Sequence, residues 1–336
     1  MGDSTNRPHN ADTTQNVSVA ELDIAIIIPC YNEAAAIATV VADFQKYLPT
    51  ATIYVYDNNS RDDTISRALA AGAIVRSEPR QGKGYVVRRM FADIEADLYV
   101  LIDGDDTYDA TVVHQLVDKL VRDNLDIVNG ARIEQETTAY RPGHKFGNRL
   151  LTGLVRVIFS DGFNDMLSGY RIFSRRFVKS FPQSSGGFEI ETELTIHALE
   201  LQMPTAEVGV AFKDRGEGSE SKLNTFSDGI RILWTIANLL KQERPMITFT
   251  VISVLLLTLA AVLSYPIFVT FFETGLVPRF PTAILATGIC LLAFLSLTAG
   301  LILDTVTRGR REAKRMRYLE IPSMLSILAH RNACNG

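Results

Sequence analysis

Two long stretches of this sequence contain no charged residue, and they constrain the fold more than any other feature. The first covers 27 positions (246–272) and the second covers 24 (280–303). A helix crosses a bilayer with about 20 apolar residues, so both stretches are long enough to span a membrane. Two buried core helices are the alternative, but such helices rarely extend so far without a charge. The short connector between the stretches predicts a hairpin of two transmembrane helices within 246–304, at about 246–270 and 281–303.

The segments beside this hairpin predict its orientation. Residues 308–317 contain six basic residues and one acidic residue. Since basic residues concentrate on the cytoplasmic side of membrane proteins, residues 305–336 are expected to form a basic cytoplasmic tail. Two crossings then place the N-terminal part on the same side. Residues 225–245 have one apolar helix face, which fits an interfacial helix lying on the membrane or an ordinary amphipathic surface helix.

The composition describes a soluble domain attached to a small membrane part. Hydrophobic residues make up 47% of the 336 positions and charged residues 21%, which is too apolar for a disordered chain and too charged for a polytopic transporter. A net charge of −4 gives no basic field of the kind that indicates nucleic-acid binding. The three cysteines lie far apart, which argues against a disulfide framework and a zinc site. Residues 1–20 are polar and are expected to be disordered.

Residues 21–224 alternate between short β-rich runs and helical patterns. This alternation predicts an α/β domain with a doubly wound, mostly parallel sheet. Ligands of such sheets bind at the carboxyl ends of the strands, so polar residues directly after strands are the first candidates for a site. The predicted strands are 22–29, 51–57, 73–77, 98–103 and 126–130, and the predicted helices are 34–48, 62–71, 83–94 and 110–124.

The strongest local signal is the acidic cluster LIDGDDTYD at 101–109. A hydrophobic strand ends at Asp103, and Asp105, Asp106 and Asp109 follow. Clustered carboxylates repel one another unless a cation neutralises them, and oxygen ligands suit Mg²⁺ or Mn²⁺. Mg²⁺ is usually held by one or two carboxylates together with substrate phosphates, so the cluster indicates a metal–diphosphate site. The alternative is a polar turn in which Asp109 caps the next helix.

Three other motifs also follow predicted strands. Asp57 ends a strand in YDNNSRDDT and is suited to accept a hydrogen bond from a base or a ribose hydroxyl. Glu33 in IPCYNE opens a helix, where it would face the ligand crevice or merely complement the helix dipole. Lys83 stands between two glycines at a helix start, where backbone N–H groups attract phosphate; a plain glycine loop is the alternative.

A further loop, RGEGSESKL at 215–223, lies shortly before the membrane-proximal segment. Arg215 and Lys222 could clamp a diphosphate or a lipid phosphate there, with Ser219 and Ser221 between them. A solvated loop without a ligand is the alternative.

Taken in order, these motifs resemble the family 2 glycosyltransferases of GT-A fold, and especially their polyprenyl-phosphate branch. That branch includes dolichol-phosphate mannose synthases and bacterial undecaprenyl-phosphate glucosyltransferases. The resemblance covers about residues 22–240, and the two-span C-terminal part matches many bacterial members. It rests on IPCYNE, DNNSRDDT, QGKG, the Asp103–Gly–Asp105 element, DMLSGYRIFSRR (165–176), GGFEIETEL (186–194) and DRGEGSESKL (214–223).

The resemblance implies a metal-dependent enzyme in a bacterial inner membrane, with its catalytic domain in the cytoplasm. It would transfer a hexose, with inversion, from a UDP- or GDP-sugar to the phosphate of a polyprenyl phosphate, and it could form a homo-oligomer. The implied nucleotide-sugar site comprises Pro29, Tyr31, Glu33, Asp57, Lys83, Asp103 and Ser221, with Asp103 and Asp105 as the ligands of Mg²⁺ or Mn²⁺. The implied catalytic residues are Asp105, Asp165, Arg215 and Lys222, and the implied groups for the acceptor phosphate are Arg132, Lys145 and Arg149.

The sequence departs from the family pattern at two places. Thr107 stands where a glutamine is common, and Asn58–Asn59 replaces a frequent Asp–Gly pair. Two other functions are alternatives to lipid glycosylation. A membrane-anchored transferase that extends a glycan usually carries a Gln-x-x-Arg-Trp motif, whereas the one tryptophan here is Trp234 in RILWTI. An inert sugar-nucleotide-binding subunit is disfavoured by the intact acidic and basic motifs.

Overall fold

The computed structural model describes residues 22–133, 163–182, 190–213 and 241–335, together with Gly153 and Asn238. The chain forms two compact units. The first comprises Met1–Asn148, Asp161–Lys222 and Arg317–Gly336, and the second comprises Arg149–Ser160 and Leu223–Met316.

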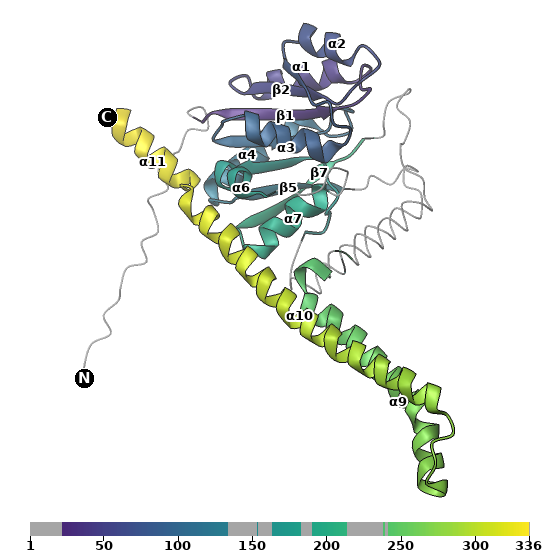
Figure 1. Cartoon of the computed structure of the whole chain (residues 1–336). Coiled ribbons are helices and arrows are strands. Elements are labelled where there is room, and N and C mark those ends of the chain that lie inside the picture. Colours follow the sequence, from purple (N-terminus) through teal and green to yellow (C-terminus); the bar gives the residue numbers. More distant parts are fainter. Residues whose placement is uncertain are drawn as a thin grey trace, which may run out of the picture. The chain divides into compact units, whose positions relative to one another are not determined.

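The first unit is built on one seven-stranded sheet (Figure 1). The strands lie in the order β3-β2-β1-β4-β6-β5-β7. All pairs are parallel except those of β6, which is antiparallel to both β4 and β5. The predicted mostly parallel sheet is therefore confirmed. The strands are β1 (Ile24–Cys30), β2 (Thr52–Asp57), β3 (Ile74–Ser77), β4 (Leu98–Leu101), β5 (Ile127–Ile133), β6 (Arg171–Ser174) and β7 (Thr205–Ala211).

Helices follow the strands as the sequence pattern predicts up to β5. A short 3-10 turn, η2, precedes α4, and the helices α6 and α7 come between β6 and β7 in the described part of the chain. Their bounds are α1 (Ile37–Tyr47), α2 (Thr64–Ala70), α3 (Lys83–Asp93), η2 (Ala110–Val112), α4 (Val113–Arg122), α6 (Arg175–Ser180) and α7 (Ile190–Glu200).

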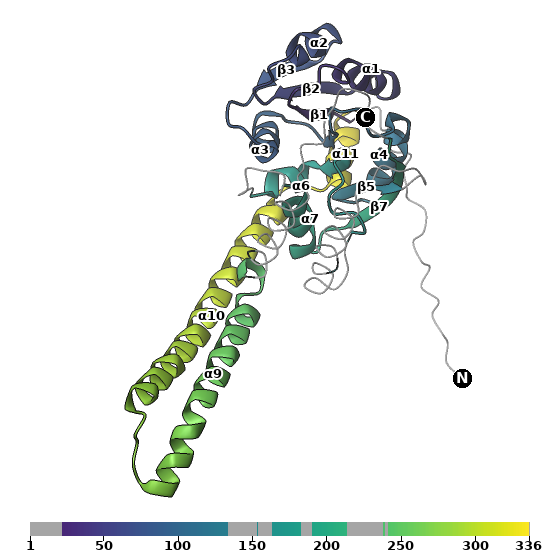
Figure 2. The ribbon, with the colours of Figure 1, turned by 90° about the vertical axis from the view of Figure 1, so that its right-hand side faces the viewer.

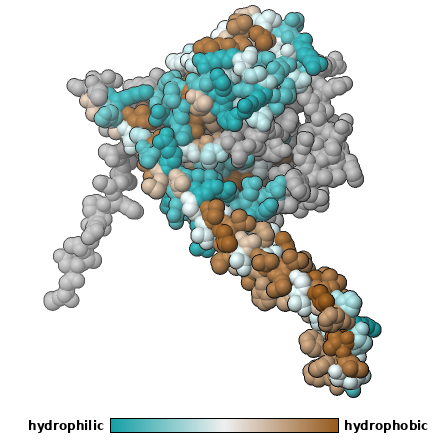
Figure 3. Space-filling view, viewed as in Figure 1, coloured by the Kyte–Doolittle hydropathy of each residue, from teal (hydrophilic) through white to brown (hydrophobic). Residues whose placement is uncertain are grey.

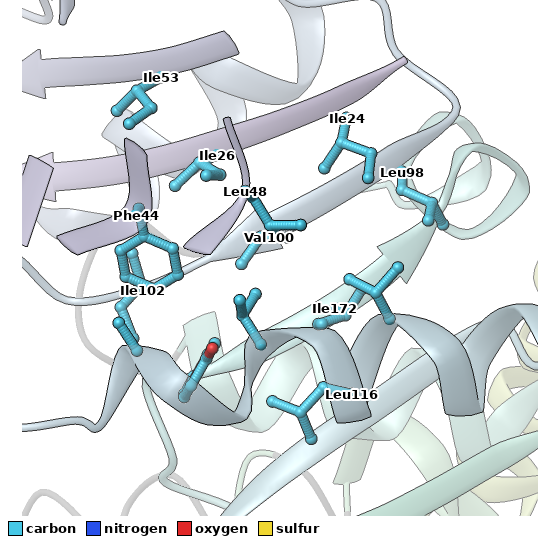
Figure 4. Packing of buried hydrophobic residues seen from close by; sticks show 14 of the residues in the cluster. Ile24, Ile26, Phe44, Leu48, Ile53, Leu98, Val100, Ile102, Leu116 and Ile172 are labelled. Atoms are coloured by element: carbon cyan, nitrogen blue, oxygen red, sulfur yellow. The ribbon is translucent and has the colours of Figure 1, made fainter. Parts of the chain in front are cut away.

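The core lies between the central strands and the helices that cover them. Strand β1 is almost continuously apolar because both of its faces are covered, and residues 24–28 are at most 1% exposed. Figure 4 shows Ile26 of β1, Val100 of β4 and Leu116 of α4 turned toward one another. This buried sheet fixes the carboxyl ends of the strands, where the predicted site residues lie.

The C-terminal helix α11 (Met324–Asn335) belongs to the first unit. Its Met324 and Leu328 are 3% and 2% exposed and lie in the same apolar core. Just before it, the Tyr318 hydroxyl donates to Asp126 at 2.7 Å, and the guanidinium of Arg176 lies 4.3 Å from the centre of the Tyr318 ring. Sequence reasoning grouped 305–336 as one tail, whereas packing assigns the part from Arg317 onward to the sheet domain.

The second unit contains helix α9 (Pro245–Thr274) and most of helix α10 (Phe280–Glu320). The two helices run side by side as a hairpin (Figure 2). Small residues recur every seven positions on α10, at Ala286, Ala293 and Gly300, and all are buried. Ser253 of α9 donates its hydroxyl to the Ala293 carbonyl oxygen at 2.8 Å, so the backbones approach closely.

The outward faces of this hairpin are apolar, as the brown surface in Figure 3 shows. Leu255 is 65% exposed and Phe272 is 82% exposed. Both helices are long and apolar enough to cross a membrane, as the sequence predicted. Helix α10 extends well past the predicted end of the span, so the basic residues 308–317 are helical. The orientation of the hairpin and the identity of the membrane that it would cross stay predictions.

Candidate active site

Four of the predicted carboxylates gather at the carboxyl ends of β1, β2 and β4. The thiol of Cys30, the last residue of β1, is 2% exposed. Burial raises the pKa of this thiol, and the charges of Glu33, Asp57, Asp103 and Asp105 raise it further. Motifs that are separate in the sequence therefore converge on one point of the sheet edge.

The loops after β1 and β2 are joined by hydrogen bonds. The Asn32 amide donates to the Ser60 hydroxyl at 2.8 Å, and the Glu33 amide donates to Thr64 Oγ1 at 2.9 Å. Asp57 is 3% exposed and accepts the Ser60 amide with both carboxylate oxygens, at 3.3 and 3.1 Å. The two loops thus form one firm rim, which also carries the half-buried Pro29 and Tyr31.

Asn58 and Asn59, which depart from the family pattern, hold the loop that leads to Lys83. Buried Asn58 donates to the carbonyl oxygens of Glu78 and Arg80, at 2.9 and 2.7 Å, and accepts the Gly82 amide at 2.7 Å. Asn59 has a φ of 66°, in the left-handed region where glycine and asparagine are favoured. This pair therefore has a structural role beneath the site.

Lys83 lies between two carboxylates at the start of α3. Its Nζ is 2.6 Å from Asp103 Oδ1 and 2.5 Å from Glu191 Oε1. Burial lowers the pKa of Lys83, but the two carboxylates raise it by more, with a net increase. Gly169 packs so closely that a Cβ there would lie 2.0 Å from Asp103 Oδ2. The Asp103 carboxylate is therefore held from two sides.

Glu191 was not among the predicted site residues. It lies in the first turn of α7 and is 5% exposed. Its Oε2 atom is buried and has no hydrogen-bond partner among the residues that the structure describes. The only sequence signal for it was its position inside the GGFEIETEL motif, because a glutamate at a helix start is common in any protein.

Asp105 is 7% exposed and accepts the Thr107 hydroxyl at 2.6 Å. Thr107 thus supports the Asp105 carboxylate from the position where a glutamine is common. Asp109 caps η2 by accepting the Thr111 amide at 2.9 Å, as predicted, so it has a separate, structural role.

The donor set at this edge fits a divalent ion that prefers oxygen ligands. Among the described residues, no three His, Cys, Asp or Glu side chains form a complete metal cage. Mg²⁺ usually takes one or two carboxylates and completes its shell with waters and substrate phosphates. Asp103 and Asp105 are two such carboxylates at one strand end, so they suit an ion that arrives with a diphosphate.

Asp165 and Arg132 form a second cluster. Arg132 donates from Nε to Asp165 Oδ2 at 2.7 Å and from Nη2 to Oδ1 at 2.8 Å. Burial raises the pKa of Asp165 and the bonds from Arg132 lower it, with a net decrease. Arg132 is therefore paired with Asp165, another predicted site residue.

Five predicted residues lie outside the described residues. They are Lys145, Arg149, Arg215, Ser221 and Lys222. The proposed interfacial helix at 225–245 also lies largely outside them.

Comparison with known proteins decides the family. The Glycosyl transferase family 2 pattern matches residues 25–181. Glycosyltransferase AglJ of Haloferax volcanii is 33% identical over 232 residues, which cover 67% of this chain and 75% of AglJ. The chain is a family 2 glycosyltransferase. Its matched region contains nearly all of β1 and the strands β2 to β6, together with Asp103, Asp105 and Asp165.

Two other similar proteins are informative about the fold. The dolichyl-phosphate hexose transferase of Haloferax volcanii is 27% identical over 66% of this chain and 96% of that protein. A glucosyl-3-phosphoglycerate synthase structure from Mycobacterium tuberculosis contains Mn²⁺, UDP-glucose and phosphoglyceric acid. It matches with a TM-score of 0.54 and 25% identity, over 66% of this chain and 80% of that one. The same enzyme has also been solved with Mg²⁺ and UDP. The glycosyltransferase therefore has the GT-A fold, in which divalent ions and UDP have been observed.

Proposed function

We propose that this glycosyltransferase transfers a hexose from a UDP- or GDP-sugar to the phosphate of a polyprenyl phosphate, with inversion at the anomeric carbon. The observation that carries the proposal is the pair of apolar helices that follows a transferase domain in the same chain. A soluble acceptor would need no such anchor, whereas a long isoprenoid stays in the bilayer. The relative named as a dolichyl-phosphate hexose transferase supports the same acceptor class.

The chemistry of a phosphate acceptor suits the charges at this site. A phosphate monoester has its second pKa near about 6, so at neutral pH it is already largely a dianion. One of its oxygens attacks the anomeric carbon while the bond from that carbon to the nucleoside diphosphate breaks. No strong base is needed, which agrees with Asp165 being an ion-paired carboxylate of lowered pKa.

The residues of the chain have separate tasks in this proposal. Asp57 and the rim around Tyr31 bind the nucleoside, and Lys83 holds the Asp103 carboxylate beside the diphosphate. Bound Mg²⁺ or Mn²⁺ on Asp103 and Asp105 would supply positive charge for the leaving diphosphate.

Further residues, most of them basic, are proposed to bind the donor and the lipid phosphate. Arg215, Ser221 and Lys222, which lie outside the described residues, are proposed to bind the donor, as the resemblance implies. Arg132, with Lys145 and Arg149, remains our candidate for the lipid phosphate, although two of its donors bind Asp165 in this structure.

A panel of UDP- and GDP-sugars with undecaprenyl phosphate tests the function, with the glycolipid detected by mass spectrometry. Asp105→Asn should nearly abolish transfer with an unchanged melting temperature, because it removes a charge at almost constant volume. Chelation by EDTA should abolish transfer by the wild-type enzyme, and added Mn²⁺ or Mg²⁺ should restore it. Full activity in EDTA would refute the proposed metal dependence. Transfer only to an oligosaccharide would favour the glycan-extending alternative.

We also propose that the domain and the basic residues 308–317 face the cytoplasm of a bacterial cell, at its inner membrane. A single cysteine placed at position 276 should then react with an impermeant reagent added outside. Labelling only after the inner face is opened would reverse this orientation. A homo-oligomer, which cross-linking in the membrane would detect, also stays a prediction.

A further inference from the structure

Glu207 of β7 accepts four hydrogen bonds and lies outside every motif that the sequence singled out. Its Oε1 accepts from Asn129 Nδ2 at 2.9 Å and from the Asp165 amide at 3.1 Å. Its Oε2 accepts from the backbone and side-chain amides of Asn164, at 2.8 and 2.7 Å. One half-buried carboxylate therefore binds the loop that carries Asp165.

The sheet itself places Glu207 under this loop. Strands β5 and β7 are parallel neighbours, and Asn129 is the register partner of Glu207. Asn129 Nδ2 also donates to the Asp165 carbonyl oxygen at 2.8 Å. The peptide groups on both sides of the Asp165 Cα are thus bound, one by Glu207 and the other by Asn129. The direction of the Asp165 side chain follows from this fixed backbone.

The same loop is bound at its other end. The Ser168 hydroxyl donates to the Gly130 carbonyl oxygen at 2.5 Å, and the Gly169 amide donates to the Tyr108 hydroxyl at 2.7 Å. Buried Arg171 donates to the Met166 and Ser168 carbonyl oxygens. At the Asn164–Asp165 end, Glu207 accepts from both residues, while Arg132 binds the Asp165 carboxylate itself.

We propose that Glu207 is a positioning residue, which aims the Asp165 carboxylate at Arg132 and so shapes the acceptor side of the site. This rests on the proposed function, in which Arg132 and Asp165 lie beside the acceptor. All four groups that face Glu207 are donors, and only a carboxylate can accept from all of them. Glutamine would turn its own NH₂ group toward two of these donors and repel them.

Glu207→Gln in the full-length protein is the test, with Glu95→Gln as the matched control. Glu95 is a salt-bridged surface residue whose side chain is 65% exposed, so the same chemical change there should alter neither exchange nor transfer. Hydrogen exchange followed by mass spectrometry measures how firmly the backbone amides of the Asp165 loop are held. Exchange in peptides covering 163–168 should become at least about tenfold faster in Glu207→Gln, which corresponds to the loss of one or two charge-assisted bonds.

Kinetics then separate positioning from a general loss of structure. We expect kcat/KM for the acceptor to fall about tenfold to a hundredfold, while KM for the nucleotide sugar stays within about twofold. If Glu207 acts through Asp165, the double variant Glu207→Gln/Asp165→Asn should be little worse than Asp165→Asn alone. Additive losses, or equal losses for donor and acceptor, would overturn the proposal.

The two hypotheses fail in different ways. If the wild type does not glycosylate polyprenyl phosphate, the proposed function is wrong, and the kinetic comparison moves to the acceptor that the wild type does use. If exchange in 163–168 is unchanged by Glu207→Gln, the positioning role is wrong whatever the acceptor is.

Discussion

Lys83→Met offers the sharpest test of how the donor side of the site is built. Methionine keeps the length and apolar stem of lysine but removes the ammonium that lies between Asp103 and Glu191. Two carboxylates would then face each other without a cation. The charge of Glu191 is affected most, because its side chain is 7% exposed and one of its oxygens already lacks a hydrogen-bond partner within the described part of the chain.

The structure sets the expected size of the effect. Removal of one partner from a buried ion pair costs about 3–5 kcal/mol. The Asp103 side chain is 29% exposed, so water screens part of its charge and the lower end, about 3 kcal/mol, applies. For a domain of this size about 1 kcal/mol shifts the melting temperature by about 2–4 °C, which predicts a decrease of about 6–12 °C.

A second substitution tests the cause. Lys83→Met/Glu191→Gln also removes the Glu191 charge that Lys83→Met leaves unpaired, so it should recover about half or more of the lost melting temperature. Thermal unfolding of the detergent-solubilised full-length protein measures both. The reasoning is refuted if Lys83→Met melts within about 2 °C of wild type. It is also refuted if the double variant melts at a lower temperature than Lys83→Met alone.

Three further predictions address the rest of the domain. Gly169→Ala should slow transfer by about a hundredfold, the scale for a displacement of about 1 Å, because its methyl group would lie 2.0 Å from Asp103 Oδ2. Asp165 has a lowered pKa in the folded state. The Asp165–Arg132 ion pair therefore stabilises the fold fully above about pH 4, the pKa of an aspartate in the unfolded chain. This stabilisation is lost as the pH falls through the lower pKa of Asp165 in the folded state. The melting difference between wild type and Asp165→Asn should thus hold from pH 8 to 5 and shrink below about pH 4. Tyr318→Phe removes the bond to buried Asp126 and should cost about 1.5 kcal/mol in thermal unfolding.

Matched variants keep these predictions specific. Gly309→Ala adds a methyl group that meets no atom within 4 Å, so transfer should be unchanged; normal transfer in Gly169→Ala would mean that Asp103 moves without consequence. Tyr265→Phe alters a tyrosine that is 72% exposed and should leave melting unchanged. Equal effects of Tyr265→Phe and Tyr318→Phe would show that the Asp126 contact contributes nothing.

Periodicity predicted the first half of the sheet well because that half obeys simple rules. Strands β1 and β4 are apolar and almost wholly buried, β2 is buried at four of its six positions, and turn residues separate these strands from the helices. Strand β6 gave no comparable signal. It has four residues, and one of them, Arg171, is fully buried. So short a run does not indicate that β6 lies between β4 and β5 and pairs antiparallel with both.

Motifs predicted the acidic centre, but they could not predict which side chains bind each other. Lys83 and Glu191 are 108 positions apart, and Arg132 and Asp165 are 33 apart. Such pairs depend on how the strands are ordered in the sheet, and local periodicity carries no information on that order. Glu207 was missed for the same reason, because TAEVGVA resembles an ordinary edge strand until its neighbour Asn129 is known.

The charge at the sheet edge supplies a physical argument for a divalent cation in the proposed reaction. Lys83 divides one positive charge between Asp103 and Glu191, so it cannot also neutralise an incoming diphosphate. A nucleotide sugar brings further negative charge to a place where carboxylates already raise the pKa of the Cys30 thiol. Repulsion between like charges a few ångströms apart is strong when water is partly excluded. A donor that binds here must therefore bring a cation to the Asp103 and Asp105 carboxylates or draw additional basic side chains over itself. If it brings a cation, affinity for UDP should collapse in EDTA even before any transfer is measured. If basic side chains suffice, UDP affinity should survive chelation and fall when Arg215 or Lys222 is neutralised. Isothermal titration of UDP with and without Mn²⁺ distinguishes the two, and we expect the cation to be required.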